Sequence, residues 1–297
     1  MKKLLDVIKE AEDKKVAIGH FNISNLEGLW AIFRAAKDLS VSVLNGVEVP
    51  IIIGVSEGER DFVGIPQVRA LISAFRDQYN YPIYLNADHT YSFERVKEVV
   101  DAGFDAVIFD GSALSLDENI KITKQCVEYA KSKNPDILVE GELGFIGKSS
   151  KMLDELPDDV AITNETITKV EEAKRFVEET GVDLLAPAVG NIHGMLKNVP
   201  NPRLHIEHIK KLREAIGVPL VLHGGSGIID EDFKQAIIAG ISIIHINTEL
   251  RVAYQQGLKR SLQENPEEIA PYKILKESLL GMKQVAEKRL RLFNNFF

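Results

Sequence analysis

Short apolar runs rich in β-branched residues alternate along the chain with longer segments of helical periodicity. This alternation is typical of successive βα units around a parallel sheet. The predicted strands are Val16–His20, Pro50–Gly54, Pro82–Asn86, Ala106–Phe109, Asp136–Val139, Asp183–Ala188, Pro219–Leu222 and Ile241–Ile246. Eight strands with helices between them favour an α/β fold closed into a (β/α)8 TIM barrel over an open doubly wound sheet.

Three segments do not fit the regular alternation. No low-complexity linker divides the 297 residues, so we expect a single barrel domain over 1–297 that carries these segments as additions. Residues 41–49 are predicted to form a small hairpin or a strand extension. Residues 148–164 are predicted to be a charged active-site loop, because long loops of this kind often cover or bind substrate. Residues 265–297 are predicted to form one or two helices whose apolar end docks on the barrel or on a partner subunit.

Composition excludes several functional classes. The formal charge of −8 at pH 7 argues against nucleic-acid and membrane-surface partners, which usually require a basic surface. Cys126 is the single cysteine, so no intrachain disulfide can form. The first residues lack the apolar core of a signal peptide, and no apolar run approaches the roughly 20 residues of a membrane span. We therefore expect a cytoplasmic protein.

Three histidines stand in short polar or glycine-rich breaks directly after apolar runs. They are His89, His193 and His223. In a barrel, the loops after the strands converge on one cavity at the carboxyl end of the sheet. Three imidazoles that meet there can hold a divalent cation and leave positions open for water or substrate. The sequence therefore predicts metal-assisted chemistry.

Further polar residues follow the same strand ends. Asp88 precedes the first of the three histidines, Asp110 follows the fourth strand, and Glu140 and Glu142 alternate on the fifth. Buried carboxylates need a cation or hydrogen-bond donors, and a metal would supply one. Asp110 has the alternative role of capping the turn that follows it. His205 and His208, which share a helix face, are predicted to be solvated and are rejected as ligands.

Two segments are suited to phosphate. The run His223-Gly-Gly-Ser-Gly offers backbone N–H groups and a hydroxyl after the seventh strand, and Asn247-Thr248 precedes a helix after the eighth. Loops in these two places are a common phosphate site in barrels, and a helix N-terminus adds a favourable dipole. A plain turn is the alternative for the glycine run. Its position after a strand that ends in histidine favours the phosphate site.

Taken together, these motifs resemble those of the class II ketose-bisphosphate aldolases, which cleave fructose or tagatose bisphosphate with zinc. The resemblance runs from Phe21 to Arg251. Its most specific pieces are Asp88-His89, Phe109-Asp-Gly-Ser, Glu140-Gly-Glu-Leu-Gly, Gly190-Asn-Ile-His-Gly and His223-Gly-Gly-Ser-Gly.

The resemblance implies a role for each matched position. It makes His89, His193 and His223 zinc ligands. Asp110 and Glu142 match carboxylates that lie near an alternative position of the metal or near a second cation, which is either divalent or monovalent. Asp88 matches the residue that transfers a proton at the hydroxyl across the scissile bond. The residues that match phosphate-binding positions are Ser56, Gly194, Gly224, Gly225, Ser226, Asn247 and Thr248.

The chain also departs from the family pattern. His245 stands where the family usually has an asparagine that contacts the enediolate, and His20 stands where the residue is usually small. The first and last strands of a closed barrel are neighbours, so we expect these two imidazoles to lie within about 8 Å, the reach of a one-water bridge. The loop after Gly147 is altered as well. Asp154 and Glu155 are the candidates for the catalytic carboxylate of this loop, and we choose Glu155. The predicted catalytic residues are therefore Asp88, His245 and Glu155.

These observations lead to an expected function. We expect a zinc-dependent aldolase that cleaves a ketose 1,6-bisphosphate, most plausibly fructose 1,6-bisphosphate, to dihydroxyacetone phosphate and an aldehyde phosphate. Another metal-dependent sugar-phosphate isomerase or hydrolase on the same barrel is one alternative, because a fold does not fix a function. A sugar-phosphate binding protein without activity is the other. The resemblance implies a homodimer or a higher homo-oligomer.

Overall fold

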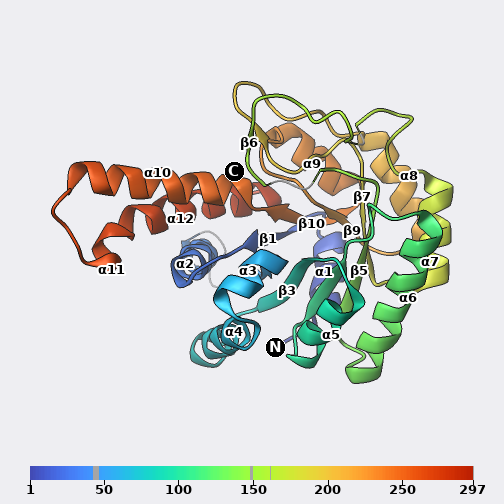
Figure 1. Ribbon diagram of the computed structural model, residues 1–297, viewed down its shortest axis with the longest axis horizontal. Helices are drawn as coiled ribbons and strands as arrows, with labels where there is room; N and C mark the ends of the chain where they lie inside the picture. The colour runs from blue at the N-terminus through green and yellow to red at the C-terminus, as the bar shows by residue number, and fades with distance from the viewer. Residues whose placement is uncertain (43–46, 148–149, 161, 297) are drawn as a thin grey trace.

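The computed structural model describes residues 1–42, 47–147, 150–160 and 162–296. Eight parallel strands close into a barrel in the order β1-β10-β9-β7-β5-β4-β3-β2 (Figure 1). The barrel strands are β1 (Ile18–Asn22), β2 (Ile51–Val55), β3 (Ile83–Thr90), β4 (Ala106–Phe109), β5 (Leu138–Leu143), β7 (Leu184–Pro187), β9 (Leu220–Leu222) and β10 (Ile241–Ile246). The TIM barrel expected from the sequence is confirmed, and each predicted strand overlaps an observed one.

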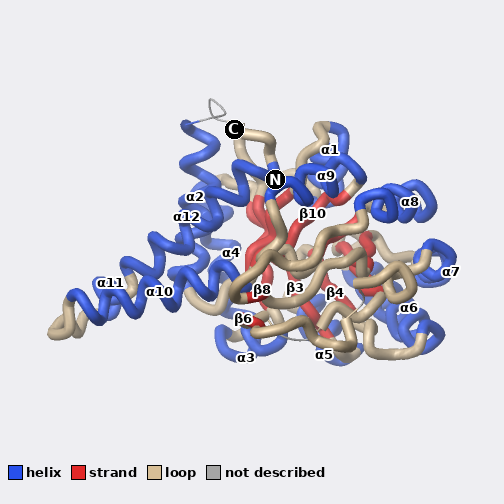
Figure 2. Tube along the Cα trace, turned by 90° about the horizontal axis from the view of Figure 1, so that it is seen from above, coloured by secondary structure: helices blue, strands red, loops and turns tan. Residues whose placement is uncertain are grey.

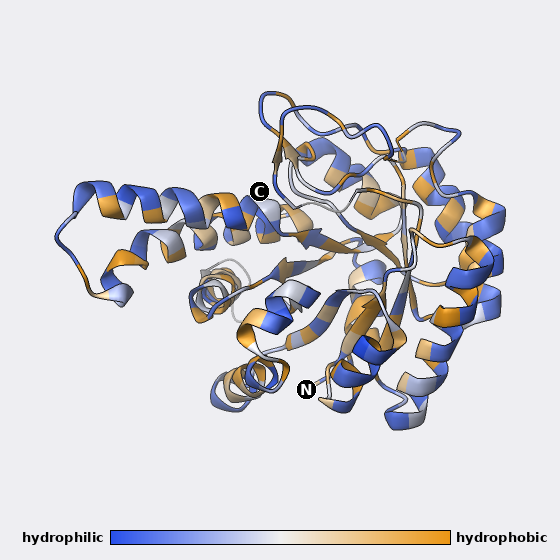
Figure 3. Cartoon of the chain, viewed as in Figure 1, coloured by the Kyte–Doolittle hydropathy of each residue, from blue (hydrophilic) through white to orange (hydrophobic). Residues whose placement is uncertain are grey.

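Helices surround this barrel, and one of them closes its amino-terminal end. The helices are α1 (Leu4–Asp13), α2 (Leu26–Ser42), α3 (Glu57–Val63), α4 (Ile65–Tyr79), α5 (Phe93–Asp101), α6 (Leu116–Lys133), α7 (Val170–Thr180), α8 (Ile206–Ile216), α9 (Asp230–Ala239), α10 (Thr248–Glu264), α11 (Pro271–Ile274) and α12 (Lys276–Phe293). Residues along the strands are mainly hydrophobic, whereas the helices alternate hydrophobic and hydrophilic positions, as helices with one buried face do (Figure 3).

The hairpin or strand extension predicted for residues 41–49 is not what the described part of that segment forms. Helix α2 continues through residues 41 and 42. Residues 47–49 belong to no helix or strand, and residues 43–46 lie outside the described part. The apolar positions that suggested a strand therefore include the end of a long helix, because a short apolar run does not by itself distinguish the two structures.

The barrel interior changes from apolar to polar along the strands. Residues two apart on a strand share a face, so Ile18, His20 and Asn22 of β1 all point to the same side. At the amino-terminal level, Ile18 packs with Tyr84 and with Leu4 of α1 in an apolar cluster that α1 covers. Buried polar residues at the carboxyl-terminal levels of the strands include His20, Asn22, Asn86, Asp88, His89, Thr90, Glu140, Glu142 and His245. The apolar layers hold the barrel together, and the polar layers form the floor of a site.

The last helices form an arm that projects from the barrel. Helices α10 and α12 pack side by side, and α11 lies at the tip, in the red part of Figure 1; the arm is also evident from above in Figure 2. The tip leaves two large apolar side chains uncovered, Ile269 at 88% exposed and Tyr272 at 76%. At the other end of α12, Leu292 and Phe293 are buried, and the Phe293 ring lies 5.3 Å from that of Phe233. The predicted docking of the apolar tail on the barrel is confirmed for these residues.

Within the described residues, none of the helices combines the length and the hydropathy needed to span a bilayer.

The close approach of α10 and α12 depends on a missing side chain. A Cβ atom at Gly257 of α10 would lie 2.5 Å from the backbone nitrogen of Ser278 in α12. We predict that Gly257→Ala lowers the free energy of unfolding by about 1–3 kcal/mol, because the helices must separate. Thermal or denaturant unfolding measures this. Gly58→Ala is the matched control, because a Cβ there meets nothing within 4 Å; equal losses in the two variants would contradict the packing explanation.

Candidate metal centre and active site

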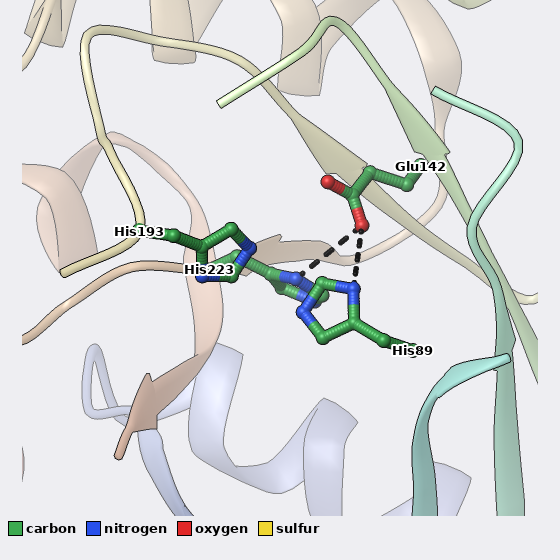
Figure 4. Close-up of side chains that lie close together, drawn as sticks. All are labelled: His89, Glu142, His193 and His223. Carbon is green, nitrogen blue, oxygen red and sulfur yellow. Dashed lines mark ion pairs between the residues drawn. The ribbon is translucent and has the colours of Figure 1, made fainter. Parts of the chain in front are cut away.

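The three histidines predicted as ligands converge at the carboxyl-terminal end of the barrel. One ring nitrogen from each of His89, His193 and His223 and one carboxylate oxygen of Glu142 lie within 4.8 Å of one another. These side chains come from β3, β5 and the loops after β7 and β9, and Figure 4 shows them turned towards one another. The ring centroid of His89 is 4.7 Å from that of His193 and 4.8 Å from that of His223. The arrangement brings four metal-capable groups to one point.

Two buried atoms of this cluster, Oε2 of Glu142 and Nδ1 of His223, have no hydrogen-bond partner among the described residues and stand 3.5 Å apart. Buried polar atoms in native proteins are nearly always partnered, by protein, water or an ion. A divalent cation would accept electron pairs from both atoms, and imidazole and carboxylate are ordinary ligands for such ions. The residues present therefore fit a metal ion.

Two carboxylates outside this group orient its imidazoles. His223 Nε2 donates a hydrogen bond to Glu140 at 2.8 Å, and His89 Nδ1 donates one to Asp110 at 3.0 Å. Such bonds fix the ring orientation and leave the other nitrogen free as a ligand. The structure thus places Asp110 behind His89, outside the four-residue group. Asp110 also accepts from the backbone and the hydroxyl of Ser112, which is the capping role considered above.

Burial and neighbouring charges shift the titration of these groups. Burial, together with the adjacent Asp110 carboxylate, raises the pKa of Glu142 to about 8. Burial lowers the pKa of His193 to about 3, with His89 and His223 acting in the same direction. For His89, burial opposes the charged form, but the carboxylates of Asp88 and Glu142 raise the pKa well above its usual value. His193 is therefore already in the uncharged form that binds metals.

The backbone at His89 is strained, and a buried arginine holds it. His89 has a φ of +43°, a left-handed conformation that non-glycine residues rarely adopt. The guanidinium of Arg60, whose side chain is fully buried, donates to the carbonyl of Asp88 at 3.1 Å and to the hydroxyl of Thr90 at 3.1 Å. It also donates to the carbonyl of Val55 at 2.7 Å. Arg60 therefore clamps both neighbours of the strained histidine, and this turn directs the imidazole into the cluster.

Asp88 is held by a second network. Asn22 donates from Nδ2 to Oδ2 of Asp88 and to Oε2 of Glu59, both at 2.8 Å. Oδ1 of Asp88 has no hydrogen bond and lies 3.8 Å from Nε2 of His89. Burial opposes ionisation of Asp88, but the neighbouring His89 and His245 hold its pKa well below the usual value. Asp88 is thus an ionised carboxylate with one oxygen fixed and the other available.

His20 and His245 stack, as expected from their strands. They are register partners on β1 and β10, and their ring centroids are 3.5 Å apart with planes 2° from parallel. The expectation that they lie within about 8 Å is confirmed. The ring of His245 also lies 4.1 Å from that of His223. A column of three imidazoles therefore connects the barrel interior to the candidate metal ligands.

The residues predicted to bind phosphate line the mouth of the barrel beside this cluster. The members that border the same pocket as Asp88, His89, His193 and His245 are Gly194, Gly224, Gly225, Ser226, Asn247 and Thr248. A Cβ atom at Gly224 would lie 2.2 Å from the carbonyl oxygen of Ile192, so this position requires glycine. The amides of Gly225 and Gly227 already donate within the protein, to His245 and Glu249. An anion here would therefore be bound by fewer amides than the sequence suggested.

A second lobe opens at the same mouth. Ser56 and Arg251 line it together with Asp88, His89 and His193. Both lobes share these last three residues, together with Ser150 and Asn247. Arg251 is 44% exposed at its side chain and pairs with buried Glu59 at 2.7 Å, and the same carboxylate accepts from the hydroxyl of Ser56 at 2.9 Å. The lobe brings a cation and a hydroxyl to the open end of the barrel.

The described part of the active-site loop reaches the mouth through a residue that we did not predict. Strand β6 (Met152–Leu153) pairs in parallel with β8 (Met195–Leu196), just after His193, and Ser150 borders both lobes. Glu155 does not join the cluster: its side chain is exposed and it borders neither lobe. Asp154 is exposed and pairs with Lys197. The pairing of β6 with β8 orients this segment, which sequence spacing could not reveal.

His205 and His208 are not solvated, contrary to our expectation. Both are half-buried, and their ring nitrogens lie 3.0 Å and 2.7 Å from the carbonyl oxygens of Ile162 and Thr168. They therefore attach the end of the active-site loop to α8, and they stand apart from the metal-capable groups of the described residues.

A closed βα barrel with buried imidazoles and carboxylates at its carboxyl-terminal mouth has the architecture of a barrel enzyme built around a metal centre. The family described as fructose-bisphosphate aldolase class-II matches residues 2–296. The fructose-bisphosphate aldolase of Geobacillus stearothermophilus is 35% identical over 293 residues, covering 98% of this chain and 96% of that protein. The chain therefore belongs to the class II fructose-bisphosphate aldolase family, whose members are lyases that use a divalent metal.

Relatives with other names are about equally similar. The 6-phospho-5-dehydro-2-deoxy-D-gluconate aldolase of Shouchella clausii is 36% identical over 290 residues, covering 97% of this chain and 92% of that one. The crystal structure of the YdjI aldolase from Escherichia coli K12 has a TM-score of 0.79 and 30% identity, covering 98% of this chain and 96% of that one. Membership therefore establishes the aldolase family and leaves the substrate open.

Several site residues were absent from the sequence prediction. Asn22, Asn86, Glu59 and Arg60 were not singled out, although all are buried beside the cluster or its supports. The two asparagines had a usable signal, because each is an inward-facing polar residue two positions along the strand from another inward residue. Glu59 and Arg60 had none, since a charged pair in a helical first turn usually lies in solvent.

The hydrogen bond from His223 to Glu140 should matter for metal affinity. We predict that Glu140→Gln weakens zinc binding by about 10- to 100-fold, because a neutral amide oxygen orients the imidazole less firmly. Competition with a chromogenic chelator measures the affinity. Glu178→Gln, on the exposed face of α7, is the control. Equal zinc affinity in the two variants would refute the orienting role of Glu140.

Proposed function

We propose that this protein catalyses the reversible, zinc-dependent cleavage of a ketose 1,6-bisphosphate, with fructose 1,6-bisphosphate as our first candidate. The products would be dihydroxyacetone phosphate and an aldehyde phosphate. One observation carries the proposal: the metal-capable cluster adjoins two pockets that both border Asp88, His89 and His193. A sugar with a phosphate at each end could place its central carbons at the cluster.

His89, His193 and His223 are the residues that we propose hold zinc, with Glu142 beside them. A bound divalent ion supplies Lewis acidity for the negative charge that develops at a ketone oxygen when the adjacent carbon–carbon bond breaks. The support for this assignment is the convergence of these groups and the unpartnered atoms of Glu142 and His223.

Asp88 is the proposed proton-transfer residue. In the cleavage direction, its carboxylate would take the proton from the hydroxyl on the carbon that becomes the aldehyde, and it would return that proton during condensation. Two features support this role: Oδ1 of Asp88 is free of hydrogen bonds, and Asn22 fixes Oδ2. Only the available oxygen would exchange a proton, which fixes the side of the sugar from which the proton leaves.

The two lobes are proposed to hold the two phosphates. Thr248 and Ser226 lie at the amino-terminal end of the 17-residue helix α10, whose dipole favours an anion. The hydroxyl of Ser226 accepts from the backbone of Glu249 at 3.1 Å, so its own proton remains available to a phosphate. In the other lobe, Ser56 and Arg251 would bind the second phosphate.

The homodimer implied by the resemblance remains a proposal. Its support in this chain is the arm, which projects beyond the barrel and exposes Ile269 and Tyr272 at its tip. Exposed apolar side chains that lie close together are typical of protein interfaces.

Removing the metal should remove the activity. We predict that treatment with a chelator abolishes cleavage of fructose 1,6-bisphosphate and that added zinc restores it, because the bound ion supplies the Lewis acidity that stabilises the developing charge. His193→Ala should fail to retain zinc. A coupled triose-phosphate assay and elemental analysis measure the two effects. Full activity in a metal-free sample would overturn the mechanism.

Substitution of Asp88 should affect catalysis without affecting metal binding. We predict that Asp88→Ala retains zinc but loses about 10²- to 10⁴-fold in kcat, the range for a general acid–base residue. The comparison needs elemental analysis and steady-state kinetics on the same preparation. If the variant keeps its kcat, the proton is transferred elsewhere. If it loses zinc, its role is structural.

A further inference from the structure

The stacked pair of His20 and His245 is fixed from two sides. Asn86 donates to Nε2 of His20 at 3.1 Å, and Gly54 leaves room for the ring, since a Cβ atom there would lie 2.0 Å from Cε1 of His20. Both histidines are buried, and their rings stack face to face with planes 2° from parallel. The pair is therefore a rigid wall of the barrel interior.

This pair is not suited to hold a second metal ion, although Asp88 lies beside it. A ring nitrogen binds a metal through a lone pair in the plane of the ring. With planes 2° from parallel and centroids 3.5 Å apart, the lone pairs of the two rings lie in separate parallel planes and do not converge on one ion. The parallel arrangement points to a different use of the free nitrogens.

Among the described residues, none forms a hydrogen bond with the ring nitrogens of His245, although Nδ1 faces the carboxylate of Asp88. Both of its ring nitrogens are buried and without a hydrogen bond, and its side chain borders the pocket at the cluster. Nδ1 of His245 is 3.3 Å from Oδ1 of Asp88, the oxygen that we assign to proton transfer. A hydroxyl bound to Asp88 at about 2.7 Å would thus lie next to the imidazole. The missing partner of His245 is then a group of the substrate.

Resting on the proposed function, we propose that His245 is the residue that selects between ketose bisphosphates that are epimers at C4, with His20 as its positioning residue. The hydroxyl that gives its proton to Asp88 is the one on C4, because C3–C4 is the bond that breaks. Fructose and tagatose bisphosphates differ only in the direction of that hydroxyl. One epimer can reach Asp88 and His245 together, and the other leaves the buried imidazole unpaired, which carries a penalty.

His20 acts through His245. It fixes the plane of the partner ring by the stack, and Asn86 fixes His20. Removing the His20 ring leaves His245 free to rotate away from the hydroxyl. The two residues are therefore expected to behave as one unit, so that losing both has little more effect than losing either.

The test compares kcat/KM for fructose and tagatose 1,6-bisphosphate in zinc-loaded protein. We expect the wild type to prefer one epimer by about 10-fold or more, the size of effect expected from an unpaired buried polar group. His245→Ala, His20→Ala and the double variant should each bring the ratio towards one by a similar factor. Gly54→Ala should do the same, because it displaces the His20 ring. Zinc affinity should remain within about 3-fold of wild type, because none of these residues is an assigned ligand.

Tyr81→Phe is the control for general loss of stability. It removes a buried hydroxyl near the opposite end of the barrel, where Tyr81 bonds to Ser40 and to the carbonyl of Val49. The ratio of kcat/KM for the two sugars should be the same in Tyr81→Phe as in the wild type. An unchanged ratio in His245→Ala, or additive effects of the two histidine substitutions, would overturn the proposal. Loss of zinc from His20→Ala would do so too, by assigning the pair to the metal site.

Failure of the proposed function gives a separate result. If the wild type cleaves neither sugar, the aldolase reaction on ketose bisphosphates is refuted. In that case, calorimetry gives the dissociation constants of the two bisphosphates, and their ratio replaces the ratio of kcat/KM values. A ratio that depends on His245 supports the pair as a selector for binding, and a ratio that does not depend on it refutes that role.

Discussion

Imidazoles and carboxylates that are buried together need partners, and this requirement governs the carboxyl-terminal half of the barrel. His223 and Glu142 lie in the cluster with atoms that no protein group satisfies. The two carboxylates that orient the imidazoles are bonded: Glu140 accepts from His223, and Asp110 accepts from His89. A site with its supports complete and its centre unpartnered is built to receive a charged ligand.

The same barrel separates stability from chemistry along its axis. The amino-terminal layers are apolar and are covered by α1, whereas the layers above them carry the polar side chains. In these polar layers the backbone is strained at His89, where Arg60 holds a left-handed conformation in place. Strain of this kind persists only where the surrounding structure enforces it, and here it turns the imidazole of His89 into the cluster.

The C-terminal arm is exposed at its tip and connected to the candidate site at its base. Arg289 of α12 is buried and bonds to Glu249 at 2.8 Å, and Glu249 accepts from the amide of Gly227 at 3.1 Å. The glycine run at the mouth is thus tied to the helix that forms the arm.

The sequence by itself determined the barrel, the order of its strands and the positions of His89, His193 and His223, because alternating βα patterns and strand ends are local features of the chain. It did not determine the supports of the site. Glu59 and Arg60 look like solvated helix residues until the barrel closes over them, and the exposure of Glu155 outside both pockets could not be read from the sequence. Which side chains face one another across a barrel depends on the register between strands, and only the tertiary structure decides that.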